Sequence, residues 1–291
     1  MLKYRLIFGT LMTVVFTAIV VLDGSVSKYM PLSVTGDKPV EGTLLCILIA
    51  ILVIPAQVEL SRLAAAKNLM IFAPISTAAS ILFATSWYWP QLIKISPPIY
   101  VFSLCAFCLL GLLLNQYIRC GTSGVIANCG ASYFSIAYLG FLSAFVLGVR
   151  IDFGVWPVLM FIFAVKSADI GAYTGGTLFG RHKFSPRISP GKTWEGMAGA
   201  ALTAIIVSVA FAASCDIMAW WLAAIFGLCF AFIGQMGDLA ESMIKRDAEQ
   251  KDSSKHVPGF GGVLDIIDSP LAAAPFAYLF LMFTARGPVL Q

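Results

Sequence analysis

The chain has 291 residues, of which 59% are hydrophobic and only 12% are charged, with a formal net charge of +4. Soluble globular domains carry about 25% charged residues, so this composition excludes an ordinary soluble domain. It predicts an all-α, polytopic integral membrane protein, and the small positive charge gives no indication of nucleic acid as a partner.

Apolar segments of about 20 residues, the length that a helix needs to cross the bilayer, recur along the chain. The third is weakened by Pro74 and by several Ser and Thr, and Pro270 and Pro275 should kink the last helix or delay its start. We predict about nine transmembrane helices, near residues 5–22, 43–60, 70–87, 99–118, 133–149, 155–174, 194–213, 217–236 and 264–284.

The distribution of Lys and Arg predicts the orientation. With the N-terminus inside, thirteen of the nineteen basic residues fall on the inner side and five on the outer side, while Lys166 lies within a span. This bias agrees with the positive-inside rule. We therefore expect the N-terminus and the two long polar loops, 175–193 and 237–263, on the cytoplasmic side of a bacterial inner membrane. Residues 6–22 also resemble a signal peptide, but no small-residue cleavage site follows, which favours an uncleaved first span.

The two halves of the chain differ in chemical content. Residues 1–150 are nearly featureless, whereas 151–291 carry most of the polar features, so we predict an N-terminal transmembrane scaffold and a C-terminal catalytic half. Cys105 and Cys108 form a CxxC pair inside an apolar run. No His or second pair accompanies them, which favours helix packing over metal or redox chemistry.

Residues 235–269 contain eleven of the 34 charged residues (19 basic, 15 acidic). Asp238, Glu241 and Lys245 are spaced to lie on one face of a helix, and Asp265 and Asp268 follow a glycine-rich turn. A solvated helix end with surface charges is the alternative. Carboxylates that converge without cations repel one another, so either their pKa values rise or they bind metal, and all-oxygen sites suit Mg²⁺. We expect one or two divalent cations, with a monovalent cation as a further candidate.

Basic residues accompany these acids. Metal together with Lys and Arg is what phosphoryl or nucleotidyl transfer requires. Contact with anionic lipid headgroups is the alternative role, and it applies most to Lys255. His256 receives no role. The cations in this segment are Lys245, Arg246, Lys251 and Lys255.

A second polar stretch precedes the predicted span at 194–213. Gly191-Lys192-Thr193 is not a P-loop, because Pro186 occupies the position of the required glycine and no strand precedes it. We expect Lys192 to bind phosphate at the start of the following helix, where backbone amides also favour anions. Asp169, one turn after Lys166, is either half of an intramembrane ion pair or a site carboxylate.

These motifs resemble those of the phosphatidate cytidylyltransferases, or CDP-diacylglycerol synthases. That family's pattern has His where this chain has Phe260 and Arg where it has Ile266, so the roles of that His and Arg cannot be carried over. The resemblance covers about 155–275 and rests on Ser242-Met-Ile-Lys245-Arg246, Lys251-Asp252, Pro258-Gly-Phe-Gly-Gly-Val-Leu-Asp265-Ile-Ile-Asp268, Ser189-Pro-Gly-Lys192-Thr-Trp-Glu195-Gly196 and Asp169-x-x-Ala-Tyr173.

The resemblance implies transfer of CMP from CTP to phosphatidic acid, which yields CDP-diacylglycerol and pyrophosphate. The lipid phosphate is already ionised at neutral pH, so catalysis needs positioning and charge neutralisation rather than a base. We assign metal binding to Asp238, Asp265 and Asp268. The expected catalytic residues are Lys192, Lys245, Arg246, Asp238 and Asp265, and the expected substrate-binding residues are Asp169, Lys183, Ser189, Lys192, Glu241, Lys251 and Asp252.

Two other functions are alternatives. One is a related CTP-dependent membrane enzyme that acts on another lipid phosphate. The other is a cation transporter with Lys166, Asp169 and Asp238 along its pathway. A homodimer follows only from the family resemblance, because Gly196-x-x-Gly199 is a weak small-residue interface.

Overall fold

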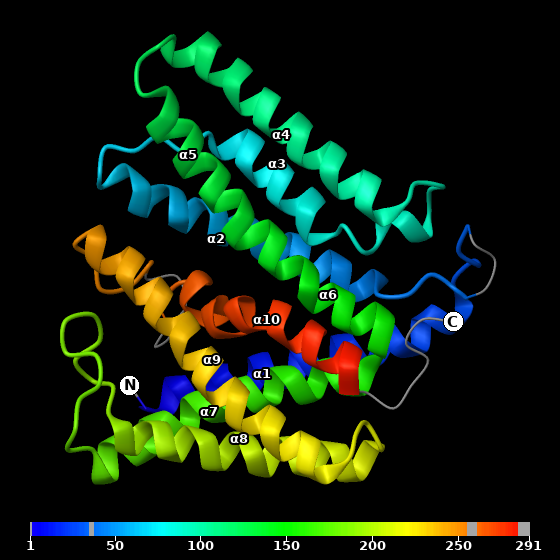
Figure 1. Cartoon of the computed structure of the whole chain (residues 1–291), viewed down its shortest axis with the longest axis vertical. Coiled ribbons are helices and arrows are strands. Elements are labelled where there is room, and N and C mark those ends of the chain that lie inside the picture. The colour runs from blue at the N-terminus through cyan, green and yellow to red at the C-terminus, as the bar shows by residue number, and fades with distance from the viewer. Residues whose placement is uncertain (1, 35–37, 255–260, 285–291) are drawn as a thin grey trace. The chain divides into compact units, whose positions relative to one another are not determined.

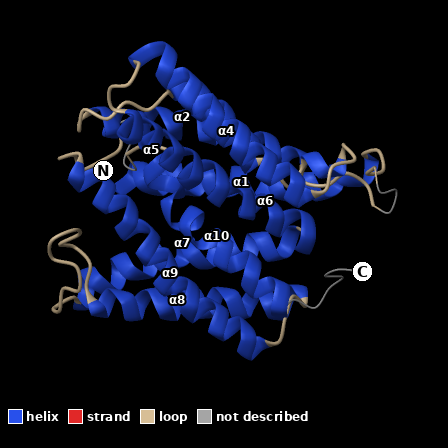
Figure 2. Cartoon of the chain, turned by 45° about the horizontal axis from the view of Figure 1, so that its top comes forward, coloured by secondary structure: helices blue, strands red, loops and turns tan. Residues whose placement is uncertain are grey.

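The computed structural model describes residues 2–34, 38–254 and 261–284 (Figure 1). Within these ranges the regular structure is helical, and the extended pairs are limited to two isolated bridges, Leu32 with Pro39 and Lys183 with Thr193 (Figure 2). The helices are α1 (Leu2–Val26), α2 (Thr43–Ala65), α3 (Ala73–Ala84), α4 (Pro97–Cys120), α5 (Val125–Ile136), α6 (Leu142–Phe153), α7 (Val155–Phe179), α8 (Trp194–Cys215), α9 (Trp220–Asp247) and α10 (Leu264–Thr284).

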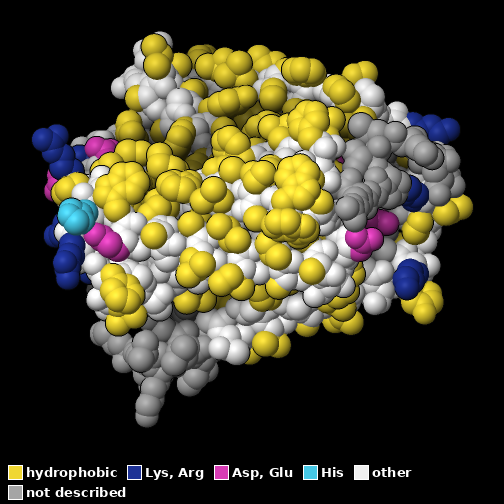
Figure 3. Space-filling model, turned by 60° about the horizontal axis from the view of Figure 1, so that its bottom comes forward, with side chains coloured by type: hydrophobic (Ala, Val, Ile, Leu, Met, Phe, Trp, Pro, Cys, Tyr) yellow, Lys and Arg dark blue, Asp and Glu magenta, His cyan; other side chains and the backbone are white. Residues whose placement is uncertain are grey.

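Eight segments of the described chain are long and apolar enough to cross a membrane. In Figure 3 hydrophobic side chains are spread across the middle of the visible face, and charged side chains are few and lie at its left and right edges. Because lipid-facing surfaces are apolar, these features confirm the predicted polytopic all-α membrane protein.

The predicted third span, 70–87, forms only a short helix. Helix α3 has 12 residues, or about 18 Å at the usual rise, which is less than the hydrocarbon thickness of about 30 Å. By contrast, the predicted span 133–149 is part of a longer helical segment of 29 residues, Val125–Phe153. A π-helical turn at Ala137–Phe141 joins α5 to α6 there. A Cβ at Gly140 would lie 2.7 Å from the Ser80 Cα, so glycine allows the close approach to α3.

Helix α10 begins at Leu264, as predicted. Pro270 and Pro275 lie inside it and do not delay its start. Helix α9 continues beyond the apolar segment to Asp247, which confirms that Asp238, Glu241 and Lys245 lie on one helix.

The chain forms two compact units. The first contains residues 1–151 and 247–266, and the second contains 152–246 and 267–291. The loop 247–266, which the sequence analysis placed in the catalytic half, therefore packs with the first unit.

The first unit has an apolar core between α3, α4 and α5. Cys108 and Cys129 are buried in this core with Phe83 and Leu112, and Cys105 packs against it. All seven cysteines are free. The CxxC pair therefore contributes to packing, as predicted.

The second unit depends on a close approach of α7 and α8, which lie side by side (Figure 1). A Cβ at Gly171 would overlap the Gly199 carbonyl oxygen, and one at Gly199 would overlap the Gly171 carbonyl oxygen. Gly196 likewise approaches the Ala172 carbonyl. The weak small-residue motif in the sequence thus has a packing role within the chain.

Candidate active site

The loop between α7 and α8 is folded back on itself so that Lys192 stands just before α8. The Trp194 amide donates to the His182 carbonyl (2.9 Å), and the Phe184 amide donates to the Lys192 carbonyl (3.3 Å). Thr193 caps the helix, because its Oγ1 accepts from the Gly196 amide (3.1 Å). The Glu195 carboxylate accepts from the backbone amides of Arg181 and His182. These bonds hold the loop at both ends.

Lys192 extends from this loop to α9. Its Nζ lies 2.7 Å from the Asp238 Oδ2 and donates to the Gln235 carbonyl oxygen at 3.0 Å. The side chain is only 11% exposed. A largely buried ammonium with one carboxylate partner remains a strong point charge for an anion that enters beside it.

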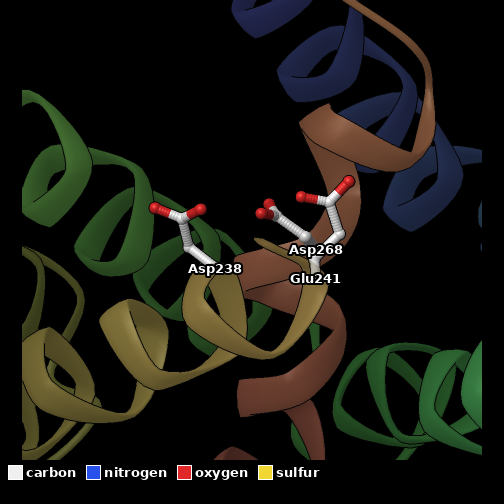
Figure 4. Close-up of side chains that lie close together, drawn as sticks. All are labelled: Asp238, Glu241 and Asp268. Carbon is white, nitrogen blue, oxygen red and sulfur yellow. The ribbon is translucent and has the colours of Figure 1, made fainter. Parts of the chain in front are cut away.

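Three carboxylates converge next to this ion pair. Asp238 and Glu241 come from α9 and Asp268 comes from α10, and one oxygen of each lies within 4.8 Å of the others (Figure 4). Glu241 and Asp268 are buried. The Asp268 Oδ1 accepts from the Ser269 amide at 2.6 Å. Like charges this close repel each other in a medium of low dielectric constant, so the cluster favours a bound cation.

Lysines balance part of this negative charge. Lys245 pairs with Glu241 one helical turn away. Lys166 pairs with Asp169 at 3.1 Å, and Asp169 also accepts from the Gln235 side-chain amide at 3.1 Å. Asp169 is therefore both half of an ion pair, as the sequence analysis proposed, and a member of the polar network that leads to Lys192.

The acid cluster suits a hard divalent cation. All three donors are carboxylate oxygens, which Mg²⁺ prefers over nitrogen or sulfur. Two oxygens that ligate one Mg²⁺ at about 2.1 Å lie at most about 4.2 Å apart. The cluster could therefore hold such an ion after side-chain shifts of less than about 1 Å, or through an intervening water.

A pocket of about 280 Å³ is lined by Lys192 and by Asp238, the member of the acid cluster that pairs with it. Asp169, Lys192 and Asp238 supply charge to its wall, and Tyr173 and Phe184 supply aromatic surface. Ser189, a predicted substrate-binding residue, also lines it. A pocket with lysine and carboxylate in its wall matches a ligand that carries phosphate and metal together.

The sequence profile of the cytidylyltransferase family matches residues 3–284. The chain belongs to the cytidylyltransferase family. Similar curated proteins include the phosphatidate cytidylyltransferases of Brucella abortus (40% identity over 157 residues, 53% of this chain and 58% of the relative), Haemophilus influenzae (40% over 138 residues, 45% and 47%) and Mycobacterium leprae (36% over 163 residues, 55% and 51%). The chain spans about half the length of the curated relatives that it matches.

The remaining predicted residues of the second unit lie at the edge of the site. The Arg246 Nε donates to the Ile188 carbonyl oxygen at 3.3 Å, which ties the end of α9 to the loop that carries Lys192. Lys183 is exposed, and its backbone forms the bridge to Thr193. Their roles in binding stay predictions.

Three predicted residues lie in the first unit. Lys251 and Asp252 are exposed in the loop after α9. The Asp265 Oδ2 accepts from the Ser253 amide (3.1 Å), the Ser253 hydroxyl (2.7 Å) and the Gly262 amide (2.7 Å). In the structure Asp265 thus organises the loop, and its metal role stays a prediction. Lys255, His256 and Phe260 lie outside the described residues, and Ile266, the other departure from the family pattern, is half-buried.

Glu241, which was predicted to bind substrate, lies in the acid cluster, and its contact with substrate stays a prediction. Glu59 was not among the predicted site residues. Glu59 is 1% exposed in α2 and binds the loop before α10. An ionisable residue inside an apolar span was the signal that could have identified it.

Proposed function

We propose that the chain is a CTP:phosphatidate cytidylyltransferase, which forms CDP-diacylglycerol and pyrophosphate at the cytoplasmic face of a bacterial inner membrane. The observation that carries the proposal is the acid cluster of Asp238, Glu241 and Asp268 beside Lys192 and a pocket. Membership of the cytidylyltransferase family and the names of the relatives support the choice of CTP and phosphatidate.

The reaction is a displacement at phosphorus. An oxygen of the lipid phosphate forms a bond to the α-phosphorus of CTP, and the bond from that phosphorus to the β-phosphate oxygen breaks, which releases pyrophosphate. The attacking oxygen is already ionised, so no general base is needed. The barrier comes from bringing two anions together, and positioning with charge neutralisation lowers it.

Each charged residue has a distinct part in this scheme. Lys192 lines the pocket and can donate to a phosphate oxygen, while its contact with the Gln235 carbonyl keeps the ammonium directed at the site. Lys245 and Arg246 add positive charge along α9. Asp238, Glu241 and Asp268 would hold Mg²⁺, which when bound neutralises triphosphate charge and orients the nucleotide. Asp265 stays a further candidate ligand.

Orientation and assembly are part of the proposal. The basic loops that carry Lys192 and Lys251 would face the cytoplasm, from which CTP enters, while the lipid arrives from the bilayer. We expect a homodimer, as the resemblance implies, and the mass of the protein in nanodiscs would measure it.

The test uses purified protein in lipid nanodiscs with CTP labelled at the α-phosphate. Phosphatidic acid and Mg²⁺ should yield labelled CDP-diacylglycerol and one pyrophosphate per turnover, and EDTA should stop the reaction. Parallel samples contain UTP or ATP in place of CTP, or a polyprenyl phosphate in place of phosphatidic acid.

Each outcome selects one function. Product only from the polyprenyl phosphate would identify the related enzyme on another lipid phosphate. The absence of any CDP-lipid would refute nucleotidyl transfer. Cation flux into liposomes without nucleotide would instead favour the transporter.

A further inference from the structure

We propose that Glu59 is a positioning residue: it holds the start of α10, and with it the acidic segment 265–268, in the arrangement that the transfer reaction requires. This inference rests on the proposed function. In this proposal Glu59 acts through its contacts with the segment that leads into α10 and does not itself bind substrate.

Glu59 is a buried carboxylate with an unusually complete set of donors. It lies in α2 and is 1% exposed. Its Oε2 accepts from the Leu264 amide (2.9 Å) and the Ser253 hydroxyl (3.1 Å). Its Oε1 accepts from the Ser254 hydroxyl (2.7 Å) and the Val263 amide (3.1 Å). An ionised carboxylate is costly in an apolar span unless hydrogen-bond donors compensate for its burial. The donors described for Glu59 all come from the segment that leads into α10, so we infer that this segment stabilises the buried charge.

These bonds cap α10 from another helix. The first amides of a helix have no partner within the helix, and Leu264 is the first residue of α10. Glu59 binds that amide and the preceding one, and its negative charge also complements the helix dipole. The start of α10 is therefore determined by a residue about two hundred positions earlier in the sequence.

Asp265, in the first turn of α10, is a second carboxylate that binds the same loop. Asp265 folds back to the Gly262 amide and to Ser253, so Ser253 lies between Asp265 and Glu59. A Cβ at Gly262 would overlap the Ser253 Oγ and the Glu59 Oε2, so glycine leaves room for both side chains. Gly261 has a φ of +98°, which a residue with a side chain rarely adopts. The glycine-rich turn thus admits the Glu59 carboxylate.

The position of α10 matters for chemistry because Asp268 follows Asp265 by three residues on the same helix and belongs to the acid cluster. Shifts of about 1 Å in catalytic groups can cost about 100-fold in rate. A residue that sets the first turn of α10 should therefore act on turnover and metal dependence more than on substrate affinity.

The main variant is Glu59→Gln. Among the described residues each Glu59 oxygen accepts from two donors, so the amide nitrogen of a glutamine in either position would face two donor groups from which it cannot accept. We expect kcat to fall about 10- to 100-fold, as for other residues that orient metal ligands. The KM values for CTP and phosphatidate should stay within about twofold, and half-maximal activity should need more Mg²⁺. Glu59→Asp, which keeps the charge, should restore part of kcat.

Hydrogen–deuterium exchange provides a readout that is independent of activity. In Glu59→Gln, the amides of Val263 and Leu264 should exchange faster than in the wild type, without CTP or Mg²⁺ present. The matched control is Gln57→Met, on the same helix. Gln57 is also fully buried and bonds to Ser135 and Ser80, not to this loop. Gln57→Met should lower thermal stability, but it should leave amide exchange at residues 263–264 and the Mg²⁺ dependence of activity unchanged.

Gly262→Ala provides a second route to the same result, because it displaces the Glu59 carboxylate without removing it. It should reproduce the kinetic signature if Glu59→Gln fails to fold. An active wild type with equally active Glu59→Gln and Gly262→Ala would overturn the inference, and so would unchanged exchange at 263–264. Failure of the proposed function would be distinct, because the wild type itself would then make no CDP-lipid.

Discussion

Two charge clusters, one in each compact unit, show how a membrane protein separates structure from chemistry. In the first unit Arg150 is 2% exposed, and its guanidinium contacts Asp23 at 2.8 Å and Glu41 at 2.9 Å. Asp23 also accepts from the Leu44 amide at 2.7 Å. In the second unit Asp238, Glu241 and Asp268 face one another, with Lys192 and Lys245 at the sides.

The difference lies in what separates the acids. The planar fork of Arg150 stands between its two carboxylates and has a fixed geometry, so the first cluster locks helix ends together. In the second cluster carboxylates face carboxylates. Their lysine partners are point charges without a fixed fork geometry, and one of them, Lys192, lines the pocket. Carboxylates that face one another, with their lysine partners beside them and not between them, indicate a ligand site. An arginine that pairs with two carboxylates at once indicates a structural role. Three variants test this distinction and a fourth tests the packing of α7 against α8, in order of expected free-energy effect.

Asp268→Asn should have the largest effect, because it removes a buried charge from the acid cluster. Loss of metal-based charge stabilisation is worth several kcal/mol, so the rate of CDP-lipid formation should fall about 1,000-fold or more. Initial rates with labelled CTP measure this. Asp152→Asn is the matched control, because the Asp152 carboxylate accepts from the Tyr278 hydroxyl at 2.7 Å and does not belong to the acid cluster, so this variant should remain active. Equal rates for the two variants would remove Asp268 from the site.

Arg150→Met should act on stability instead. It leaves Asp23 buried without its guanidinium, which costs about 3–5 kcal/mol. We expect a clearly lower Tm in nanodiscs, with near-normal turnover by the protein that remains folded. Arg119→Met, at an exposed position, serves as control. A selective loss of turnover at unchanged Tm would mean that the first cluster is not a structural lock.

Lys192→Gln should reduce kcat/KM about 100-fold, as the loss of one preorganised donor to a phosphate usually does. Lys192→Arg should recover part of this, and Lys94→Gln, an exposed lysine of the first unit, should have no effect. The measurement is the same labelled-CTP assay at several substrate concentrations. Wild-type kinetics in Lys192→Gln would contradict its contact with substrate phosphate.

Gly199→Ala should have the smallest effect, a destabilisation of about 1–3 kcal/mol, because the new Cβ would overlap the Gly171 carbonyl oxygen where α7 meets α8. Thermal unfolding measures it. At Gly111 a Cβ would meet no atom within 4 Å, so Gly111→Ala is the control and should not lower Tm. Equal Tm values for both variants would show that α7 and α8 can separate at no cost.

Local pattern predicted much of the second unit. The spacing of Asp238, Glu241 and Lys245 placed them on one face of α9, and the pairing of Lys245 with Glu241 follows from that spacing. Proximity along one helix also gave the pair of Lys166 with Asp169 as one of two alternatives for Asp169, and the structure contains that pair. The sequence excluded a P-loop at Gly191, and the structure agrees: Lys192 lies just before α8, and no strand precedes it among the described residues.

Contacts between distant segments were harder to predict. The predicted metal set was Asp238, Asp265 and Asp268, whereas the structure groups Asp238 and Asp268 with Glu241. Glu59 was missed because its partners lie about two hundred residues away. The short length of α3 was suggested by Pro74 but could not be derived from composition alone.

The sequence by itself determined what depends on neighbours along the chain: the apolar spans, the helices, and which charged residues share a helix face. Composition and short-range spacing are sufficient for these, because a helix in a membrane satisfies its own backbone. Only the tertiary structure decided which carboxylates meet, which glycines let α7 and α8 touch, and that Glu59 caps α10. Those contacts depend on how side chains of separate helices pack, and no spacing within one segment encodes that.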